Sequence, residues 1–393
     1  MSEWKETTLT DLCTEISYGY TESAKQEKVG PKFLRITDIA SGRLDWANVP
    51  YCPITDSNFD KYKLLPGDIV IARTGATTGA NYTIKETDPK DVVFASYLIR
   101  YKINIKKANP YFIGQILQSS NWKDYVDAIA GGSAQPGANA KQLGSFDILL
   151  PPLPEQTAIA SILSSLDDKI DLLHRQNATL EKMAETLFRQ WFVEEEWNGT
   201  LSEYIKVQGG FAFKSKDFKE KGFAGVIKIR NIKMGMIDIS NTDYVDQEVV
   251  NNIDKRFKIT SGDFLIAMTG AEIGKIGIVE KTEKEIWVNQ RVGKLEAKVP
   301  YGDLIGYLAL KSREGQDHII NACAGSAQEN ISSSGIEEMS FIPYKAEITN
   351  SLGKEIEPLF KKIIFNQSQI RTLTSLRDTL LPKLMSGEVR VEY

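Results

Sequence analysis

The longest regular pattern in the chain is an apolar stripe between residues 159 and 191. Apolar side chains and one asparagine recur at alternating spacings of four and three residues, the spacing of a coiled-coil contact face. The stripe consists of Ile159, Leu163, Leu166, Ile170, Leu173, Asn177, Leu180, Ala184, Leu187 and Trp191. No proline or glycine interrupts it, so it predicts one helix of 33 residues (159 to 191), about 50 Å long at ~1.5 Å per residue.

A second stripe with the same spacing lies near the C-terminus. It consists of Leu352, Ile356, Leu359, Ile363, Asn366, Ile370, Leu373, Arg377, Leu380 and Leu384. Two matching stripes in one chain are most simply explained if the two helices pack against each other. The alternative is that each helix packs separately on its own neighbouring domain.

The asparagines indicate the direction of this packing. A buried amide is costly without a partner, and a pair of amides fixes the register. An antiparallel pair places Asn177 opposite Asn366, whereas a parallel pair leaves both amides unpaired. The antiparallel register also aligns Ile159 with Leu384, Ile170 with Leu373, and Trp191 with Leu352.

The segments outside the stripes are repeated as well. Three pairs of segments match at offsets of 193 to 195 residues (227 − 34, 261 − 66 and 325 − 132): 34–39 with 227–232, 66–76 with 261–271, and 132–135 with 325–328. Short apolar runs between turn residues predict strands at 33–39, 69–72, 94–99 and 146–150, and the segment 110–119 predicts a short helix. One β-rich globule followed by one long helix therefore occurs twice.

The predicted fold is of the α+β class. Two repeated β-rich globules are separated by two long helices that form an antiparallel coiled coil, with a pseudo-twofold axis through the Asn177–Asn366 layer. The expected organisation is a first globule at 1–154, a first helix at 155–196, a second globule at 197–346, and a second helix with the C-terminal tail at 347–393.

Composition excludes several classes of protein. Apolar residues make up 42% and charged residues 25%, as in ordinary globular proteins, and no apolar run approaches the ~20 residues of a membrane span. The polar segment 1–8 does not resemble a signal peptide, and three scattered cysteines fit a reducing cytoplasm. A net charge of −4 argues against general affinity for nucleic acid but is compatible with a local basic face.

No catalytic or metal site is predicted. The segment 270–275 resembles a phosphate-binding loop, but it has three residues between its glycines where that motif needs four, and Ile276 stands where Ser or Thr should hold magnesium. A loop between two strands is the preferred interpretation. Two histidines and no closely spaced cysteines make a zinc site improbable, and nothing composes a nucleophile, a base and an oxyanion site.

Polar residues differ between the two copies at matched positions. Ser96 and Tyr97 stand against Gln290 and Arg291, and the loop 73–79 stands against 268–274. Lys and Arg neutralise phosphates, and Arg, Asn, Gln and Thr can recognise base edges. The DNA-contact candidates are Arg35, Thr37, Arg73, Thr77, Ser96 and Tyr97 in the first copy, and Lys214, Lys216, Arg230, Asn231, Lys275, Gln290 and Arg291 in the second. A merely solvated face is the alternative.

Taken together, these motifs resemble the specificity subunit of Type I restriction–modification enzymes over essentially the whole chain. The resemblance is carried by the segments 66–68 with 74–76, 149–156, 187–192, 209–218, 262–263 with 269–271, 325–328 with 330–332, and 380–388. It implies a non-catalytic subunit whose two target-recognition domains each recognise one half of a split, asymmetric DNA site. The two helices would set the distance between the half-sites.

The resemblance also implies partners. Two methyltransferase subunits would dock on this chain, and restriction and translocase subunits would join through the complex, without any membrane partner. The methyl donor, ATP and magnesium would bind to those partners, so no cofactor is expected here. Two alternatives remain: a two-headed adaptor that bridges proteins, and a specificity region detached from a single-chain methyltransferase–nuclease.

Overall fold

The computed structural model describes residues 4–40, 42, 44–131, 137–192, 195–233, 235–323 and 330–391. Contacts group these residues into two compact units: unit 1 comprises Met1–Lys169 and Thr374–Tyr393, and unit 2 comprises Ile170–Leu373. The division falls inside both long helices, so each unit contains part of each helix. The repeated segments 132–135 and 325–328 lie outside the described residues. The four sequence ranges expected for the globules and helices are not tested by this division and remain predictions.

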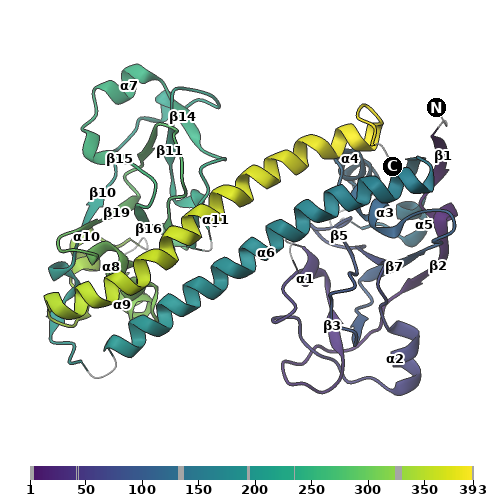
Figure 1. Ribbon diagram of the computed structural model, residues 1–393, viewed down its shortest axis with the longest axis horizontal. Coiled ribbons are helices and arrows are strands. Elements are labelled where there is room, and N and C mark those ends of the chain that lie inside the picture. Colours follow the sequence, from purple (N-terminus) through teal and green to yellow (C-terminus); the bar gives the residue numbers. More distant parts are fainter. Residues whose placement is uncertain are drawn as a thin grey trace. The chain divides into compact units, whose positions relative to one another are not determined.

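Two helices are much longer than all other described elements. Helix α6 spans Leu153–Phe192 and α11 spans Ala346–Ser386 (Figure 1). Helix α6 begins directly after Pro151 and Pro152 and contains Pro154 in its first turn, where a missing backbone N–H costs no helical hydrogen bond. Both predicted helices are therefore present and extend a few residues beyond their stripes.

The two helices pair as the asparagines predict. In unit 2, Asn366 is 0% exposed and its Nδ2 donates to Oδ1 of Asn177 over 2.9 Å. Ile170 and Leu373 share a small apolar cluster in the same unit, and Trp191 and Leu352 share its main core. In unit 1, Ile159 and Leu384 lie in one core.

Each helix also packs on the globule of its unit. Ala184 and Phe188 of α6 lie in the same core as Ile305 of unit 2, and Ile159 lies in the same core as Phe112 of unit 1. The two interpretations of the stripes are therefore not exclusive, because one face contacts both the other helix and a sheet domain.

The asparagine layer supports a stability prediction. Replacing Asn366 by Leu removes the partner of the Asn177 amide, which should cost about 1 kcal/mol for the lost hydrogen bond. Asn177→Leu together with Asn366→Leu leaves no unpaired amide, so the double variant should unfold at a higher temperature than either single variant. Thermal unfolding of the four proteins measures this coupling, and additive effects would contradict the amide pair.

Unit 1 is built on an antiparallel sheet of order β2-β7-β4-β5, beside which two short strand pairs form. Strands β3 and β6 pair in parallel, and β1 and β8 pair antiparallel. The strands are β1 Lys5–Thr8, β2 Cys13–Tyr18, β3 Lys32–Leu34, β4 Asp68–Ala72, β5 Asn81–Thr83, β6 Val92–Phe94, β7 Leu98–Ile103 and β8 Asp147–Leu150. The short helices are α1 Ile36–Ile39, α2 Asp56–Tyr62, α3 Pro110–Ile116, α4 Ser120–Ala130 and α5 Ala140–Gly144.

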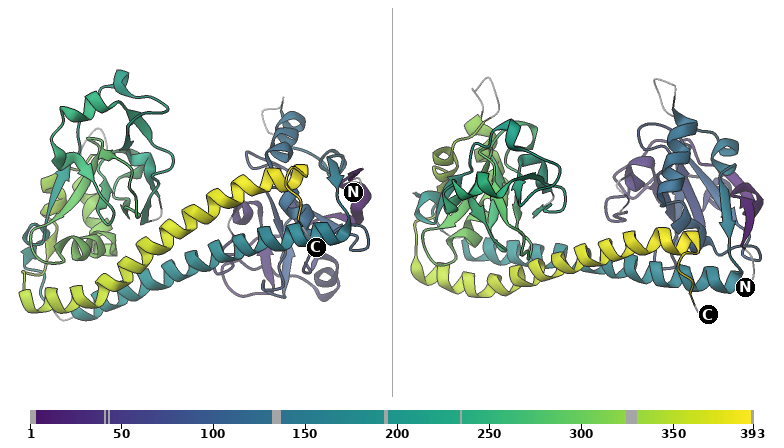
Figure 2. Two further views of the ribbon diagram at one scale, coloured as in Figure 1. Left: turned by 45° about the horizontal axis from the view of Figure 1, so that its top comes forward. Right: turned by 90° about the horizontal axis from the view of Figure 1, so that it is seen from above.

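Unit 2 repeats this topology with additional strands. Its six-stranded sheet has the order β10-β19-β16-β17-β13-β12, and its four-stranded sheet has the order β14-β11-β18-β15. The strands are β9 Gly199–Thr200, β10 Ile205–Gly209, β11 Ala224–Ile227, β12 Ile232–Lys233, β13 Gly235–Ile237, β14 Asp243–Val245, β15 Lys258–Ile259, β16 Phe264–Ala267, β17 Ile276–Ile278, β18 Ile286–Val288, β19 Val292–Ala297 and β20 Ser340–Phe341. The short helices are α7 Gln247–Asn251, α8 Gly302–Lys311, α9 Arg313–Cys323 and α10 Ser333–Glu337, and Figure 2 shows them in further views.

Every strand pairing of unit 1 has a counterpart in unit 2. The series β2-β7-β4-β5 matches β10-β19-β16-β17, and the parallel pair β3–β6 matches the parallel pair β11–β18. The edge pair β1–β8 likewise matches β9–β20. The repeat seen in the sequence is thus a repeat of topology.

Two predicted strands need correction. The segment 33–39 contains a strand only to Leu34, because the Arg35 N–H donates to the Asp38 carboxylate and a helical turn, α1, follows. The segment 94–99 is not one strand: β6 ends at Phe94, the Leu98 N–H closes a turn on the Ala95 carbonyl over 2.8 Å, and β7 begins. The predicted strands at 69–72 and 146–150 and the helix near 110–119 are confirmed.

The glycines of the phosphate-loop look-alike have a backbone explanation. Gly270 (φ 71°) and Gly274 (φ 80°) lie in the left-handed region in the loop between β16 and β17, where residues with a Cβ are strained. The equivalent loop of unit 1 has the same feature at Gly75 (φ 82°) and Gly79 (φ 87°). The interpretation as a loop between two strands is confirmed.

Candidate nucleic-acid interface

Four loops of unit 1 meet where its strands end. We call this surface loop face 1; it consists of residues 18–20 after β2, 35–37 after β3, 73–77 after β4, and 95–97 between β6 and β7. Backbone hydrogen bonds join the loops: Ala95 N–H to the Leu34 carbonyl (2.9 Å), Ser96 N–H to the Tyr20 carbonyl (2.9 Å), and Arg73 N–H to the Tyr97 carbonyl (3.1 Å). These bonds hold side by side the backbone segments that carry the six candidates of the first copy.

Unit 2 has the equivalent surface, loop face 2, formed by residues 209–211, 228–230, 268–275 and 289–291. The same hydrogen bonds recur: Asn289 N–H to the Ile227 carbonyl (3.0 Å), Gln290 N–H to the Phe211 carbonyl (2.9 Å), and Met268 N–H to the Arg291 carbonyl (3.0 Å). By these bonds Arg73 is equivalent to Met268, and Tyr97 is equivalent to Arg291. One scaffold therefore carries two different sets of side chains.

Arg73 is the most available cation of loop face 1. Its guanidinium lies over the Tyr18 ring, 5.1 Å from the ring centroid, and no carboxylate among the described residues pairs with it. Its buried Nε has no hydrogen-bond acceptor among the described residues. The guanidinium can therefore meet an outside acceptor without breaking an ion pair to a described residue.

The turns between β6 and β7 and between β18 and β19 carry three exposed candidates. Tyr97 is 59% exposed, and Gln290 and Arg291 are exposed on the equivalent turn. Within the described part of the chain, the Arg291 guanidinium has no hydrogen-bonding or ionic partner. These side chains can contact a ligand without giving up an internal contact.

Other candidate cations are already paired. Arg35 binds Asp38 at 2.8 Å, and the hydrogen bond to that carboxylate raises the pKa of Arg35 although burial opposes the rise. Arg230 and Lys228 both bind Asp243, at 2.6 and 2.5 Å. Burial alone would raise the pKa of the Asp243 carboxyl, but the hydrogen bonds and charges of these two partners lower it overall.

The remaining candidates occupy varied positions. Lys275 forms an ion pair with Glu272 in the loop between β16 and β17. Thr37 is exposed on α1, whereas Thr77 and Ser96 are half-buried. Lys214 and Lys216 are exposed in the loop after β10 and have no ionic partner among the described residues.

Asn231 does not present its side chain at the surface. It is 1% exposed, its Oδ1 accepts the Lys228 N–H, and its Nδ2 donates to the carbonyls of Asp238 and Asn241. The equivalent residue of unit 1 is Asp38, which holds the Arg35 N–H in the same way. In this conformation Asn231 supports the loop backbone, and a contact between its amide and DNA would require these three bonds to break.

Tyr18 and Lys228 belong to the basic and aromatic residues that the sequence offers near these loops, although neither is among the contact candidates named above. Tyr18 carries the Arg73 guanidinium, and the Lys228 ammonium lies 3.5 Å from the centroid of the Phe218 ring. The repeat aligns Lys228 with the candidate Arg35, so the sequence alone could have added this lysine to the contact candidates. The packing of Tyr18 on Arg73 depends on strand pairing and has no local sequence signal.

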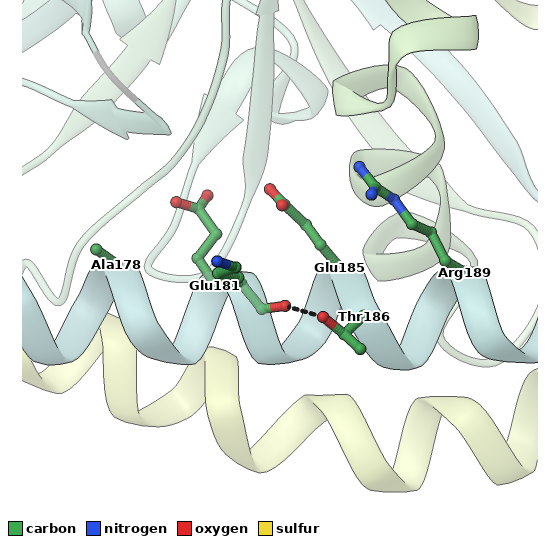
Figure 3. A pocket seen from close by; sticks show the side chains of 6 residues that line it. Ala178, Glu181, Glu185, Thr186 and Arg189 are labelled. Carbon is green, nitrogen blue, oxygen red and sulfur yellow. Dashed lines mark hydrogen bonds between the residues drawn. The ribbon is translucent and has the colours of Figure 1, made fainter. Parts of the chain in front are cut away.

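A shallow concavity in unit 2 follows one face of α6. Figure 3 shows Glu181 and Glu185 directed away from α11. The Tyr307 hydroxyl donates to Glu181 over 2.6 Å, and Lys311 pairs with Glu185 at 3.0 Å and also with Glu181. These contacts attach α6 to α8. We therefore interpret this polar face as structural.

Among the described residues, neither a metal-binding cluster nor a membrane-spanning helix is present. These residues contain no group of three or more His, Cys, Asp or Glu side chains placed to hold a metal ion. No helix in the same ranges combines the length and apolar character needed to cross a membrane.

Comparison with known families gives two matches along the chain. The family described as Type I restriction modification DNA specificity domain matches residues 1–182 and again residues 194–373. The chain belongs to this family. Its role is therefore DNA sequence recognition as a specificity subunit, which is a recognition rather than a catalytic role. The two matches correspond to the two copies of the repeat.

Similar proteins carry the same description. The MjaIX specificity subunit of Methanocaldococcus jannaschii is 25% identical over 83% of this chain and 76% of its own length. The HindI specificity subunit of Haemophilus influenzae is 22% identical over 99% of this chain and 100% of its own length. A crystal structure of a Type-I restriction-modification S subunit from M. genitalium shares the fold, with a TM-score of 0.60, 18% identity, and coverage of 97% of this chain and 96% of that one.

Proposed function

We propose that this specificity subunit recognises a bipartite, asymmetric DNA target, with one half-site contacted by loop face 1 and the other by loop face 2. The observation that carries the proposal is the equivalence of the two faces in backbone hydrogen bonding combined with their difference in side chains. A duplicated scaffold with identical faces would favour a palindrome, whereas two different faces favour two unrelated half-sites.

The charges of the faces are suited to this task. Arg73 on loop face 1, Arg291 on loop face 2, and Lys214 and Lys216 in the loop after β10 have no ionic partner among the described residues and can meet phosphates or base edges. Arg35, Lys228 and Arg230 are held by carboxylates and would have to exchange an internal ion pair for a phosphate. We therefore rank the unpaired cations first as contacts.

The long helices serve two further roles in this proposal. They set the distance between the half-sites, and they offer docking positions to two methyltransferase subunits, through which restriction and translocase subunits join. In unit 2, Met183 of α6 and Phe365 of α11 are about half exposed and are available for contact with such a partner. The methyl donor, ATP and magnesium would bind to those partners.

An exchange of one unit's globule tests the assignment of half-sites. Residues 1–154 are replaced by the matching segment of a relative with another target, and the complex selects DNA from a random library. One half-site should change completely while the other keeps its sequence. A change in both half-sites, or in neither, contradicts the proposal.

Salt dependence tests the phosphate contacts and the competing adaptor function. Lys214→Ala with Lys216→Ala should weaken binding to all sequences alike and reduce the slope of log K against log salt by about two, since each neutralised phosphate contributes roughly 0.9. The control is Lys106→Ala with Lys298→Ala, which makes the same charge change beyond the far ends of β7 and β19. If neither pair alters the slope, these lysines do not contact phosphate. A wild-type complex that does not bind DNA would favour the adaptor.

A further inference from the structure

In each unit one guanidinium has no ionic partner among the described residues, and the two units present it from different backbone positions. In unit 1 it belongs to Arg73 at the end of β4, and the facing turn carries Tyr97. In unit 2 the equivalent strand end carries Met268, and the turn carries Arg291. The arginine thus follows the strand in unit 1 and lies on the turn in unit 2. The same backbone hydrogen bond joins the strand end to the turn in both units.

Tyr18 fixes the arginine of unit 1. Its backbone is held in the sheet opposite Ile99, and its hydroxyl accepts the N–H of Ala140, the first residue of α5, over 3.2 Å. The ring held at both ends lies under the Arg73 guanidinium. At the equivalent place in unit 2 stands Gly209, opposite Gly293, where no side chain could support a cation.

We propose that Arg73 and Arg291 each recognise a guanine, one in each half-site, and that Tyr18 is the positioning residue for Arg73. This inference rests on the proposed function. Guanine is the base with two acceptors, O6 and N7, in the geometry of an arginine fork, and the commonest base-specific contact in the major groove pairs the two. A guanidinium stacked on a ring keeps its plane and its terminal nitrogens free for such a contact.

The test uses the full-length chain assembled with its methyltransferase partners. Selection from random DNA first defines the two half-sites, and each guanine is then replaced in turn by 7-deazaguanine, which lacks the N7 acceptor. Arg73→Ala should weaken binding to the selected site by roughly 5- to 140-fold, equivalent to about 1–3 kcal/mol. In the Arg73→Ala variant, replacing one particular guanine of one half-site by 7-deazaguanine should not weaken binding any further. Arg291→Ala should behave in the same way in the other half-site.

Variants at Tyr18 test its positioning role. Tyr18→Leu should reproduce the loss of base preference seen with Arg73→Ala, while Tyr18→Phe, which keeps the ring, should retain most of the preference. Arg73→Lys keeps the charge without the fork, so it should lose the base preference but keep the salt slope. Unchanged preference in the other half-site shows that each variant is folded.

Three results would overturn the inference. The first is a selected half-site without guanine, and the second is a Tyr18→Leu variant that keeps the base preference of the wild type. The third is an Arg73→Ala variant that weakens binding to all sequences equally and lowers the salt slope by about one, which identifies a phosphate contact. A wild-type complex that selects no bipartite sequence would instead contradict the proposed function.

Discussion

A subunit with seven extra residues in each long helix is expected to lose its original target and to bind the same two half-sites with a longer spacer. The insertions follow Lys169 in α6 and Leu373 in α11, where the division between the units falls. Seven residues preserve the phase of the stripe and add about 10 Å of helix at ~1.5 Å per residue, comparable to roughly three base pairs.

The contacts on either side of the insertions are expected to remain. In unit 1, Ile159 and Leu384 stay in one core, and in unit 2 the Asn177–Asn366 bond and the Ile170–Leu373 contact keep their register. Selection of DNA by the double-insertion complex measures half-sites and spacer together. Retention of the original spacer would show that the helices do not set the distance.

An insertion in one helix alone is the matched control. It adds the same heptad but shifts α6 against α11, so the pairing cannot stay in register in both units at once. We expect this variant to unfold at a lower temperature and to bind neither target. Binding as tight as that of the double insertion would mean that the two helices act independently.

The helix pair was predictable because its determinants are local and periodic. A spacing of four and three residues defines a face, and a single asparagine in each face defines direction and register, so Asn177 and Asn366 could be placed together from the sequence. The repeat was predictable for a similar reason, since equivalent segments keep the same order and spacing along the chain.

The ends of the strands were harder to predict because distant backbone pairing decides them. The run 94–99 is apolar enough for one strand, yet Phe94 pairs in parallel with Leu34 while Leu98 pairs with Ala72 in another sheet. The chain must therefore turn between them. That turn places Ser96 and Tyr97 on loop face 1.

Whether a candidate side chain is paired within the protein depends on neighbours that the sequence does not identify. Arg230 and Arg291 have the same chemistry, but Asp243 pairs with Arg230 and no described residue pairs with Arg291. Asn231 looked like a base contact by residue type, and only the fold shows that all its hydrogen bonds go to backbone groups. Residue type thus predicted the faces better than the individual contacts.

Removal of the Arg390 side chain is expected to destabilise unit 1 strongly. Glu155, in the first turn of α6, is 0% exposed, and both its oxygens accept hydrogen bonds from Arg390, with Nη2 donating to Oε2 over 2.7 Å. The Arg390 guanidinium also lies 5.5 Å from the Trp4 ring centroid. The C-terminal segment is thereby attached to the start of α6.

The size of the effect follows from the buried carboxylate that is left behind. Losing one partner of a buried ion pair costs about 3–5 kcal/mol, and the partial exposure of Arg390 places Arg390→Met near the lower end of that range. At about 2–4 °C per kcal/mol for a domain of this size, the melting temperature of unit 1 should fall by roughly 6–12 °C. Calorimetry or circular dichroism of the full chain measures this shift.

A surface pair of the same chemistry provides the control. Arg313 pairs with Asp317 on α9, four residues away and largely exposed, so Arg313→Met should change the free energy of unfolding by no more than about 0.5 kcal/mol. Glu155→Leu combined with Arg390→Met removes both charges and should recover much of the lost stability, because no unpaired carboxylate remains. Equal stability of the Arg390→Met and Arg313→Met variants would mean that the Glu155 carboxylate finds enough stabilisation from the N-terminus of α6 alone.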